Sequence, residues 1–253
     1  MRRLLVINPN TSASVSTLLQ THLQAASGPQ VRVRTVTARF GAPYISDEAS
    51  YAVAGHATLD AWAAALVKPD GGPHEAPDAV LIGCFGDPGL LALRESSAVP
   101  VTGLAEAAFI EAARHGRFAI VTGGERWGPM LERLAQALGH APLLAGIHTV
   151  APTGAQLAAD PLAASALLGQ ACRDAQRQWG VQAVILGGAG LAGMAAAIQP
   201  GLDVPVIDSV LAGARWALCP QAPPARRGTP GFDVAWSNVS PELAALGMQG
   251  ATP

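Results

Sequence analysis

Short runs of aliphatic and β-branched residues alternate along the chain with longer Ala- and Leu-rich stretches of helical periodicity. Several short runs are almost continuously apolar, as expected of strands covered on both faces. Strands that alternate with helices in this way predict βαβ units and an α/β fold with parallel sheets. The predicted strands span residues 4–8, 31–38, 79–83, 99–102, 118–122, 147–151, 183–186 and 204–207. The predicted helices lie near residues 12–26, 48–67, 88–97, 104–115, 125–138, 154–179, 190–198 and 209–218.

The last part of the chain differs in composition. A Pro-, Arg- and Gly-rich stretch starts at Pro220, and a further strand is predicted over residues 232–236. A short helix is expected after the capping sequence Ser240-Pro241-Glu242. The end of the chain, residues 247–253, is expected to fray.

Two segments of the chain repeat each other. Residues 78–90 (Asp-Ala-Val-Leu-Ile-Gly-Cys-Phe-Gly-Asp-Pro-Gly-Leu) resemble residues 182–194 (Gln-Ala-Val-Ile-Leu-Gly-Gly-Ala-Gly-Leu-Ala-Gly-Met). Each continues through a predicted helix into a Val-Pro-Val strand. Cys84 in the first segment and Gly188 in the second occupy equivalent positions. Repetition of whole supersecondary units predicts two similar structural halves.

The start of the chain has a counterpart as well, because residues 4–10 resemble residues 118–124, each a strand followed by a turn into a helix. We therefore expect two pseudo-symmetric α/β halves, each with a parallel sheet. Residues 1–103 together with 208–253 form the first half, and residues 104–207 form the second. Ligands of such sheets bind beyond the carboxyl ends of the strands, so we expect the active site in the cleft between the halves.

Cys84 carries the clearest candidate chemistry. It follows a predicted strand, lies between Gly83 and Phe85-Gly86, and precedes a predicted helix. A helix N-terminus offers free N–H groups and partial positive charge, and this predicts a lowered thiol pKa. The alternative is a buried structural cysteine. Cys172 and Cys219 fall within helical patterns, and we interpret both as packing residues.

Other turn residues are candidates for binding. The backbone N–H groups of the glycine-rich turns at Thr122-Gly123 and Gly188-Ala189 are suited to hold a carboxylate or enolate oxygen, although glycine also simply permits a tight turn. The segment from Asn8 to Ser12 combines amide side chains with a predicted helix cap. His56 is a candidate for the cleft, and an ordinary histidine on a helix surface is the alternative.

Composition and charge exclude several classes of protein. Half of the chain is hydrophobic, which excludes wholesale disorder. The 16 basic and 18 acidic residues give a net charge of -2 without a basic block, so we expect no nucleic-acid partner. No apolar run reaches the roughly 18–20 residues of a membrane helix, and the N-terminus lacks the features of a signal peptide. We therefore expect a cytoplasmic protein without a membrane partner.

The residue types also argue against cofactors. Lys68, the single lysine, lies in a Pro- and Gly-rich loop and is a poor candidate for a pyridoxal-phosphate Schiff base. The six histidines lack metal-binding spacing, and the three cysteines are far apart. The glycine-rich turns do not match a nucleotide-binding motif. We predict no metal and no cofactor.

Four blocks together resemble the aspartate/glutamate/hydantoin racemase superfamily, with the hydantoin racemases as the most similar branch. They are residues 7–12 (Ile-Asn-Pro-Asn-Thr-Ser), 83–90 (Gly-Cys-Phe-Gly-Asp-Pro-Gly-Leu), 186–190 (Leu-Gly-Gly-Ala-Gly) and 204–208 (Val-Pro-Val-Ile-Asp). The resemblance implies two pseudo-symmetric α/β halves with the active site between them, and activity without pyridoxal phosphate or metal. It also implies two cysteines on opposite faces of the substrate, which carry protons to and from the carbon next to a carbonyl or carboxylate.

The resemblance assigns the first of these cysteines to Cys84. It implies that Asn10, Thr122 and the backbone amides near Phe85 and Ala189 hold polar groups of the substrate. With their neighbours in the turns they complete the predicted binding set: Asn8, Asn10, Thr11, Phe85, Gly86, Thr122, Gly123, Gly188 and Ala189.

The chain departs from the family pattern at the second cysteine, where it has Gly188. A two-base racemase needs an acid and a base on opposite faces of a planar intermediate, and glycine supplies neither. Three outcomes remain. His56 or a water serves the second face; or the chemistry is one-sided, as in the arylmalonate decarboxylase relatives that work with a single cysteine; or the chain binds without catalysis.

We predict a cofactor-independent enzyme of the racemase superfamily, an isomerase that transfers protons through Cys84 at the carbon alpha to a carbonyl or carboxylate. Its substrate is a small acid or a cyclic ureide. One-sided decarboxylation or isomerisation is the alternative, and a non-catalytic small-acid binding protein is the second alternative. We expect a homo-oligomer.

Overall fold

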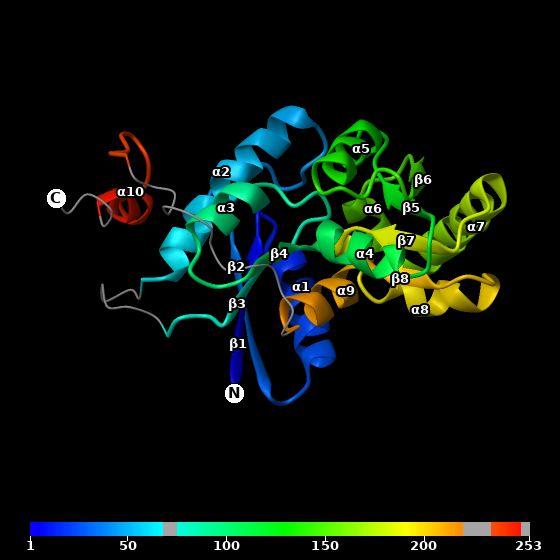
Figure 1. The fold of residues 1–253 in the computed structure, drawn as a ribbon, viewed down its shortest axis with the longest axis horizontal. Helices are drawn as coiled ribbons and strands as arrows, with labels where there is room; N and C mark the ends of the chain where they lie inside the picture. The colour runs from blue at the N-terminus through cyan, green and yellow to red at the C-terminus, as the bar shows by residue number, and fades with distance from the viewer. Residues whose placement is uncertain (68–74, 220–233, 249–253) are drawn as a thin grey trace.

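The chain folds around two four-stranded parallel sheets. The computed structural model describes residues 1–67, 75–219 and 234–248. The first sheet has the order β2-β1-β3-β4 and comprises β1 (Arg2–Asn8), β2 (Val31–Thr37), β3 (Ala79–Ile82) and β4 (Val101–Gly103). The second sheet has the order β6-β5-β7-β8 and comprises β5 (Phe118–Gly123), β6 (Leu144–Val150), β7 (Ala183–Gly187) and β8 (Val206–Asp208). The predicted α/β fold with two similar halves is confirmed (Figure 1).

Strand register confirms the internal repeat. Ile7 of β1 is paired with Ile82 of β3, and Val121 of β5 is paired in the same way with Leu186 of β7. Cys84 and Gly188 each lie two residues beyond these paired positions. They therefore occupy the same place in the two sheets, as the repeat predicts.

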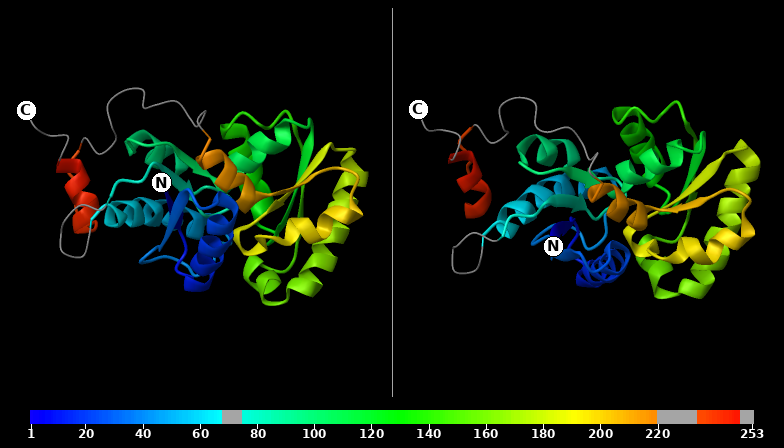
Figure 2. Two further views of the ribbon diagram at one scale, coloured as in Figure 1. Left: turned by 90° about the horizontal axis from the view of Figure 1, so that it is seen from below. Right: turned by 60° about the horizontal axis from the view of Figure 1, so that its bottom comes forward.

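Helices cover both sheets (Figures 1 and 2). The helix α9 follows the last strand of the second sheet and packs on α1 and α4, so it crosses back toward the first half. The helical elements are α1 (Ala13–Ser27), α2 (Glu48–Ala65), α3 (Leu90–Ser96), α4 (Leu104–Ala113), α5 (Trp127–Ala137), α6 (Gly154–Ala159), α7 (Pro161–Trp179), α8 (Met194–Ile198), α9 (Ser209–Ala217) and α10 (Pro241–Met248), with 3₁₀ turns η1 (Ala189–Leu191) and η2 (Gln199–Gly201).

Three predicted elements differ most from the structure. The single helix predicted over residues 154–179 is two helices, because Pro161 cannot continue α6 and instead opens α7, capped by the Asp160 side chain. The helix predicted over residues 190–198 is η1 followed by α8, with Gly193 in a left-handed conformation between them. The strand β6 begins at Leu144, three residues before its predicted start.

The tail joins the first half through α10. The Ser240 hydroxyl accepts a hydrogen bond from the Leu243 N–H, so the predicted cap is present. Leu243 is buried in the cluster formed with α2, and Arg39 pairs with both Asp60 and Glu242. The loop that carries Lys68 and residues 220–233 lie outside the described residues. The described part of the strand predicted over residues 232–236 is not a strand.

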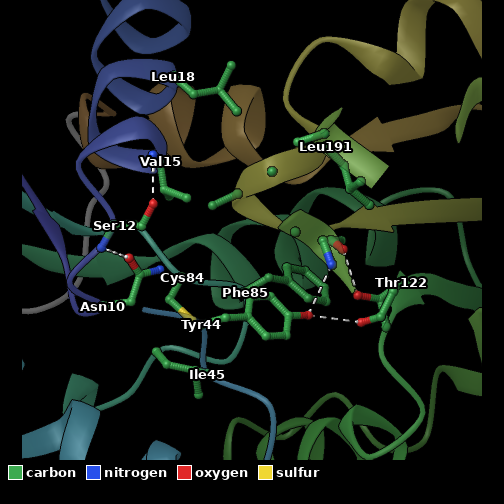
Figure 3. Close-up of a pocket in the computed structure, with 18 of the residues that line it drawn as sticks. Asn10, Ser12, Val15, Leu18, Tyr44, Ile45, Cys84, Phe85, Thr122 and Leu191 are labelled. Atoms are coloured by element: carbon green, nitrogen blue, oxygen red, sulfur yellow. Dashed lines mark hydrogen bonds between the residues drawn. The ribbon is translucent and has the colours of Figure 1, made fainter. Parts of the chain in front are cut away.

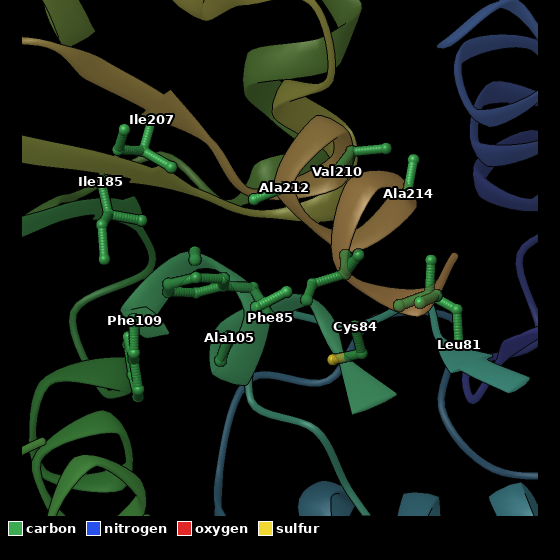
Figure 4. Packing of buried hydrophobic residues seen from close by; sticks show 14 of the residues in the cluster. Leu81, Cys84, Phe85, Ala105, Phe109, Ile185, Ile207, Val210, Ala212 and Ala214 are labelled. Atoms are coloured by element: carbon green, nitrogen blue, oxygen red, sulfur yellow. The ribbon is translucent and has the colours of Figure 1, made fainter. Parts of the chain in front are cut away.

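One apolar core runs from the first sheet through α4 and α9 to the second. The Phe109 ring stacks on Phe118, with ring centroids 5.9 Å apart, and meets the Phe85 ring edge-on at 6.2 Å. Phe85 directly follows Cys84, so the core reaches the turn that carries the thiol (Figure 4). This continuous packing holds the two halves together beneath the predicted cleft. Within the described helices, none is long and apolar enough to cross a membrane.

Candidate active site

A cavity of about 440 Å³ lies where the carboxyl ends of the strands of both sheets converge (Figure 3). The two halves both contribute to its walls. Its lining comprises Asn10, Ser12, Ser14, Val15, Leu18, Pro43, Tyr44, Ile45, Gly83, Cys84, Phe85, Thr122, Gly123, Trp127, Gly154, Ala158, Ala159, Gly187, Gly188, Ala189, Gly190 and Leu191. The predicted position of the site, at the strand ends between the halves, therefore has a cavity suited to a small molecule.

The Cys84 thiol lines this cavity from the turn that follows β3. The turn is tight, because the Cys84 carbonyl accepts hydrogen bonds from the N–H groups of Gly86 and Asp87, both at 3.1 Å. Helix α3 begins only at Leu90, so its N-terminus is not adjacent to the thiol. Burial, with 8% of the residue exposed, raises the pKa of the Cys84 thiol, and the Asp87 carboxylate raises it further. The predicted lowering of the thiol pKa is wrong for this reason.

Asp87 anchors the same turn to α4. Its carboxylate accepts hydrogen bonds from the N–H groups of Ala105 (3.0 Å) and Glu106 (2.8 Å), at the start of α4. The residue has a φ of 52°, in the left-handed region that a side chain rarely adopts. Burial raises the pKa of this carboxyl to about 7, although hydrogen bonds from backbone N–H groups favour the charged form and lower the pKa.

Seven of the predicted site residues meet at the cavity: Asn10, Cys84, Phe85, Thr122, Gly123, Gly188 and Ala189. The Asn10 side-chain oxygen accepts hydrogen bonds from Asn8 Nδ2 and the Ser12 N–H. Among the described contacts this leaves the Asn10 NH₂ group available to a ligand. The Thr122 hydroxyl donates to the Gly187 carbonyl at 2.7 Å, so its oxygen remains an acceptor.

Three predicted binding residues lie outside the cavity lining. Asn8 is fully buried and uses its NH₂ group on Asn10, Ser12 and the Ser16 hydroxyl, so it supports the loop rather than the ligand. The Thr11 N–H donates to the Ala42 carbonyl. Gly86 is covered by the Trp127 ring, which would come within 2.4 Å of a Cβ there.

His56 is also not part of the cavity. It lies exposed on α2 and meets the Phe40 ring edge-on, with ring centroids 4.9 Å apart. It borders a separate surface depression beside Asp60 and Ser240. The hypothesis that His56 serves the second face of the substrate is therefore wrong: α2 turns this side chain outward.

Tyr44 and Trp127 are the main lining residues that the sequence did not indicate. The Tyr44 hydroxyl oxygen accepts a hydrogen bond from the Gly154 N–H at 3.2 Å and lies 3.5 Å from the Gly123 carbonyl oxygen. Tyr44 comes from the irregular loop between β2 and α2, and Trp127 opens α5. Loops without periodicity carry no signal for side-chain direction, and the loop of Tyr44 contains a second aromatic residue, Phe40, so the sequence does not distinguish which ring faces the cavity.

Gly188 has a different backbone conformation from Cys84, although the two positions are equivalent. Its φ is 146°, whereas Cys84 has no positive φ. A Cβ on Gly188 would lie 3.3 Å from Leu191 Cγ. The Gly188 N–H donates to the Ser209 hydroxyl at 3.2 Å. The turn after β7 is thus built around glycine.

Comparison with known proteins decides the family. A model of the family described as Asp/Glu/Hydantoin racemase matches residues 4–217. The chain belongs to this family. It is 30% identical over 213 residues to a hydantoin racemase of Pseudomonas sp. (strain NS671), covering 84% of this chain and 83% of that one. It is 32% identical over 217 residues to a hydantoin racemase of Paenarthrobacter aurescens, covering 85% of this chain and 89% of that one.

Solved structures agree with this assignment. An allantoin racemase from Klebsiella pneumoniae superposes with a TM-score of 0.77 at 32% identity, covering 85% of both chains. An allantoin racemase from Pseudomonas fluorescens superposes with a TM-score of 0.79 at 28% identity, covering 85% of this chain and 88% of that one. The chain is therefore an isomerase-family enzyme of the racemase fold, as its sequence motifs indicate.

The cavity of this racemase-family chain is uncharged. Among its lining residues, only Cys84 and Tyr44 carry an ionisable side chain, and none is Lys, Arg, His, Asp or Glu. Burial raises the pKa of the Tyr44 hydroxyl, so it stays protonated at neutral pH. The site offers hydrogen bonds without a formal counter-charge.

Proposed function

We propose that the chain catalyses proton exchange at the carbon alpha to a carbonyl in a neutral cyclic ureide, with Cys84 removing and returning the proton. The single observation that carries this proposal is a thiol in an uncharged cavity. Aspartate or glutamate would bring charges that no lining side chain neutralises, and unpaired buried charge is costly. The names of two kinds of relatives, hydantoin racemase and allantoin racemase, also point to cyclic ureides.

The hydrogen-bonding groups of the lining suit a ureide ring. Such a ring has carbonyl oxygens that accept and N–H groups that donate. The Asn10 NH₂ group can donate to a ring carbonyl, and the Thr122 oxygen can accept from a ring N–H. Val15, Leu18 and Leu191 form an apolar wall toward α1 and η1 (Figure 3). A ureide ring with an apolar substituent would form hydrogen bonds through the ring and pack the substituent against the apolar wall.

The raised pKa of Cys84 fits the role of a base. A thiolate formed at a buried thiol is scarce, but it is a stronger base than an exposed one and better matched to a weakly acidic C–H bond. It takes the proton from the ring carbon, and the electron pair moves to the carbonyl oxygen to form an enolate. Hydrogen-bond donors around the cavity stabilise that oxygen. The thiol then returns a proton to carbon.

Gly188 makes this exchange one-sided. The two-base scheme implied by the family resemblance has a second proton-transferring group on the other face of the ring, and glycine has none. Proton removal and return by Cys84 alone keeps the configuration of the substrate. We expect the hydrogen on the ring carbon to exchange with solvent faster than the substrate racemises.

The test follows each enantiomer of 5-isobutylhydantoin in deuterated water, by NMR for the C5 proton and by chiral chromatography for configuration. We expect one enantiomer to exchange with retention, with both enantiomers inert in Cys84→Ala and no exchange with aspartate or glutamate. Rapid racemisation with exchange of both enantiomers would contradict one-sidedness. Exchange of aspartate would contradict the substrate class.

Decarboxylation is the second candidate, favoured by the same absence of a second thiol among the lining residues. After loss of carbon dioxide, Cys84 would protonate one face of the resulting enolate. Release of carbon dioxide from a phenylmalonate without hydantoin exchange would support this alternative. Hydantoin binding without exchange or carbon dioxide release would instead indicate a non-catalytic binding protein.

A further inference from the structure

We propose that Tyr44 is a catalytic hydrogen-bond donor, whose hydroxyl binds the substrate carbonyl oxygen and stabilises the negative charge that develops on it. This inference rests on the function proposed above, since it concerns the same cavity and the same enolate.

The Tyr44 oxygen is held in the cavity wall by a backbone donor. A phenol oxygen both donates and accepts hydrogen bonds. The Gly154 N–H donates to it at 3.2 Å, so one acceptor site is occupied by a backbone N–H group. This bond does not use the hydroxyl proton, which can be donated to a ligand.

The Tyr44 hydroxyl proton has only a distant acceptor among the described residues. Its partner among the described residues is the Gly123 carbonyl oxygen at 3.5 Å, whereas O–H···O bonds ordinarily span about 2.5–3.0 Å. A ligand oxygen in the cavity can provide a shorter bond. Figure 3 shows the hydroxyl directed to the end of the cavity near Thr122, with the Cys84 sulfur beside the same ring.

The Tyr44 hydroxyl keeps its proton in the cavity. Burial raises the pKa of Tyr44, and negative charge on Cys84 raises it further. The phenol thus stays protonated while the thiolate acts as base. A neutral donor fixed by the Gly154 N–H bond needs little reorganisation when the substrate oxygen becomes negative, which is the property of an effective oxyanion site.

The test compares two cyclic ureides that differ in charge. Barbiturate, a cyclic ureide that is anionic at neutral pH, imitates the enolate. 5,5-Dimethylhydantoin is neutral and has no proton to lose at C5. We expect Tyr44→Phe to weaken barbiturate binding about 10- to 100-fold and dimethylhydantoin binding less than about 5-fold, because hydrogen bonds to charged groups are the stronger ones. Calorimetry or ligand-detected NMR measures both constants.

Tyr51→Phe is the matched control. Tyr51 is the other of the two tyrosines, and its hydroxyl donates to the Gly86 carbonyl at 2.8 Å outside the cavity lining. Any effect of Tyr51→Phe should be equal for the two probes. A purely structural role of Tyr44 would likewise weaken both probes equally, and that result would overturn the proposal.

A second measurement keeps the test independent of the folding of Tyr44→Phe. In the Tyr51→Phe background, 3-fluorotyrosine labels position 44 alone. We expect saturation with barbiturate to shift the ¹⁹F resonance more than saturation with dimethylhydantoin does. Equal shifts, or none, would overturn the role of Tyr44 while leaving the proposed function intact. If neither probe binds the unaltered protein, the proposed substrate class fails and the inference fails with it.

Discussion

The ring of Phe85 lies directly against the Cα atom of Gly187, so that a Cβ on Gly187 would come 2.2 Å from Phe85 Cε1. These residues are the chain neighbours of Cys84 and Gly188, in the equivalent turns of the two halves. Trp127 of the second half covers Gly86 of the first in a similar way. Phe85 and Trp127 thus each pack an aromatic ring against a glycine of the other half, and these contacts hold the two halves close together beside the cavity.

Gly187→Ala is expected to destabilise the fold by about 1–3 kcal/mol, because the added methyl group must displace the buried Phe85 ring. Denaturant unfolding measures the change. Gly128→Ala is the control: a Cβ there has nothing within 4 Å, and alanine in the helix α5 should be neutral or stabilising by up to about 1 kcal/mol. Phe85→Leu should recover part of the loss in the double variant. Equal stability of the two alanine variants would contradict this packing.

Cys84→Ser should abolish deuterium exchange at the substrate, whereas Cys219→Ser should retain it. Iodoacetamide should modify the half-buried Cys219 faster than Cys84, since burial and Asp87 raise the pKa of the Cys84 thiol. The modification rate of Cys84 should keep increasing with pH above the ordinary thiol pKa of about 8.5. Mass spectrometry of peptides separates the sites. A plateau for Cys84 near neutral pH would contradict the raised pKa.

Asp87 should make stability decrease as the pH rises from about 4 to about 7. Its pKa is 3.8 when unfolded and is raised to about 7 in the fold, so between these values the folded state holds a proton that the unfolded state has released. That contribution is complete below the unfolded pKa and is lost as pH rises through the folded one. Asp87→Asn cannot titrate, so its unfolding free energy, measured by urea denaturation, should lack this decrease. Parallel pH profiles for both proteins would refute the assignment.

Gly188→Cys should restore a thiol to the second turn but at a cost in stability. A φ of 146° is unfavourable for a side chain, and the Cβ would press on Leu191, so we expect a loss of about 1–3 kcal/mol. Leu191→Ala in the same chain should relieve the contact and give the higher racemisation rate. Chiral chromatography compares the single and double variants with the unaltered protein. A Gly188→Cys protein of full stability would show that the turn is more adaptable than its backbone indicates.

Local pattern in the sequence determined the order and type of most elements. The apolar runs that form β1, β3, β5 and β7 can be recognised in the sequence, because a strand buried on both faces needs continuous hydrophobic residues. The repeat around Cys84 and Gly188 followed from the same local signal, and the strand register confirms it. The position of Cys84 beyond a strand end then predicted a place in the cleft.

Tertiary packing decided the properties of the site. The thiol pKa of Cys84 rises because burial removes water, which a helix assignment from sequence could not reveal. His56 points outward because α2 packs on β1, β2 and α3 with its other side, and Tyr44 points inward because the loop before α2 meets the second half at Gly154. The sequence alone placed a thiol beside a glycine-rich turn. Contacts between the halves enclose the thiol and this turn in a cavity without charged side chains, because burial arises only where segments distant in the sequence meet.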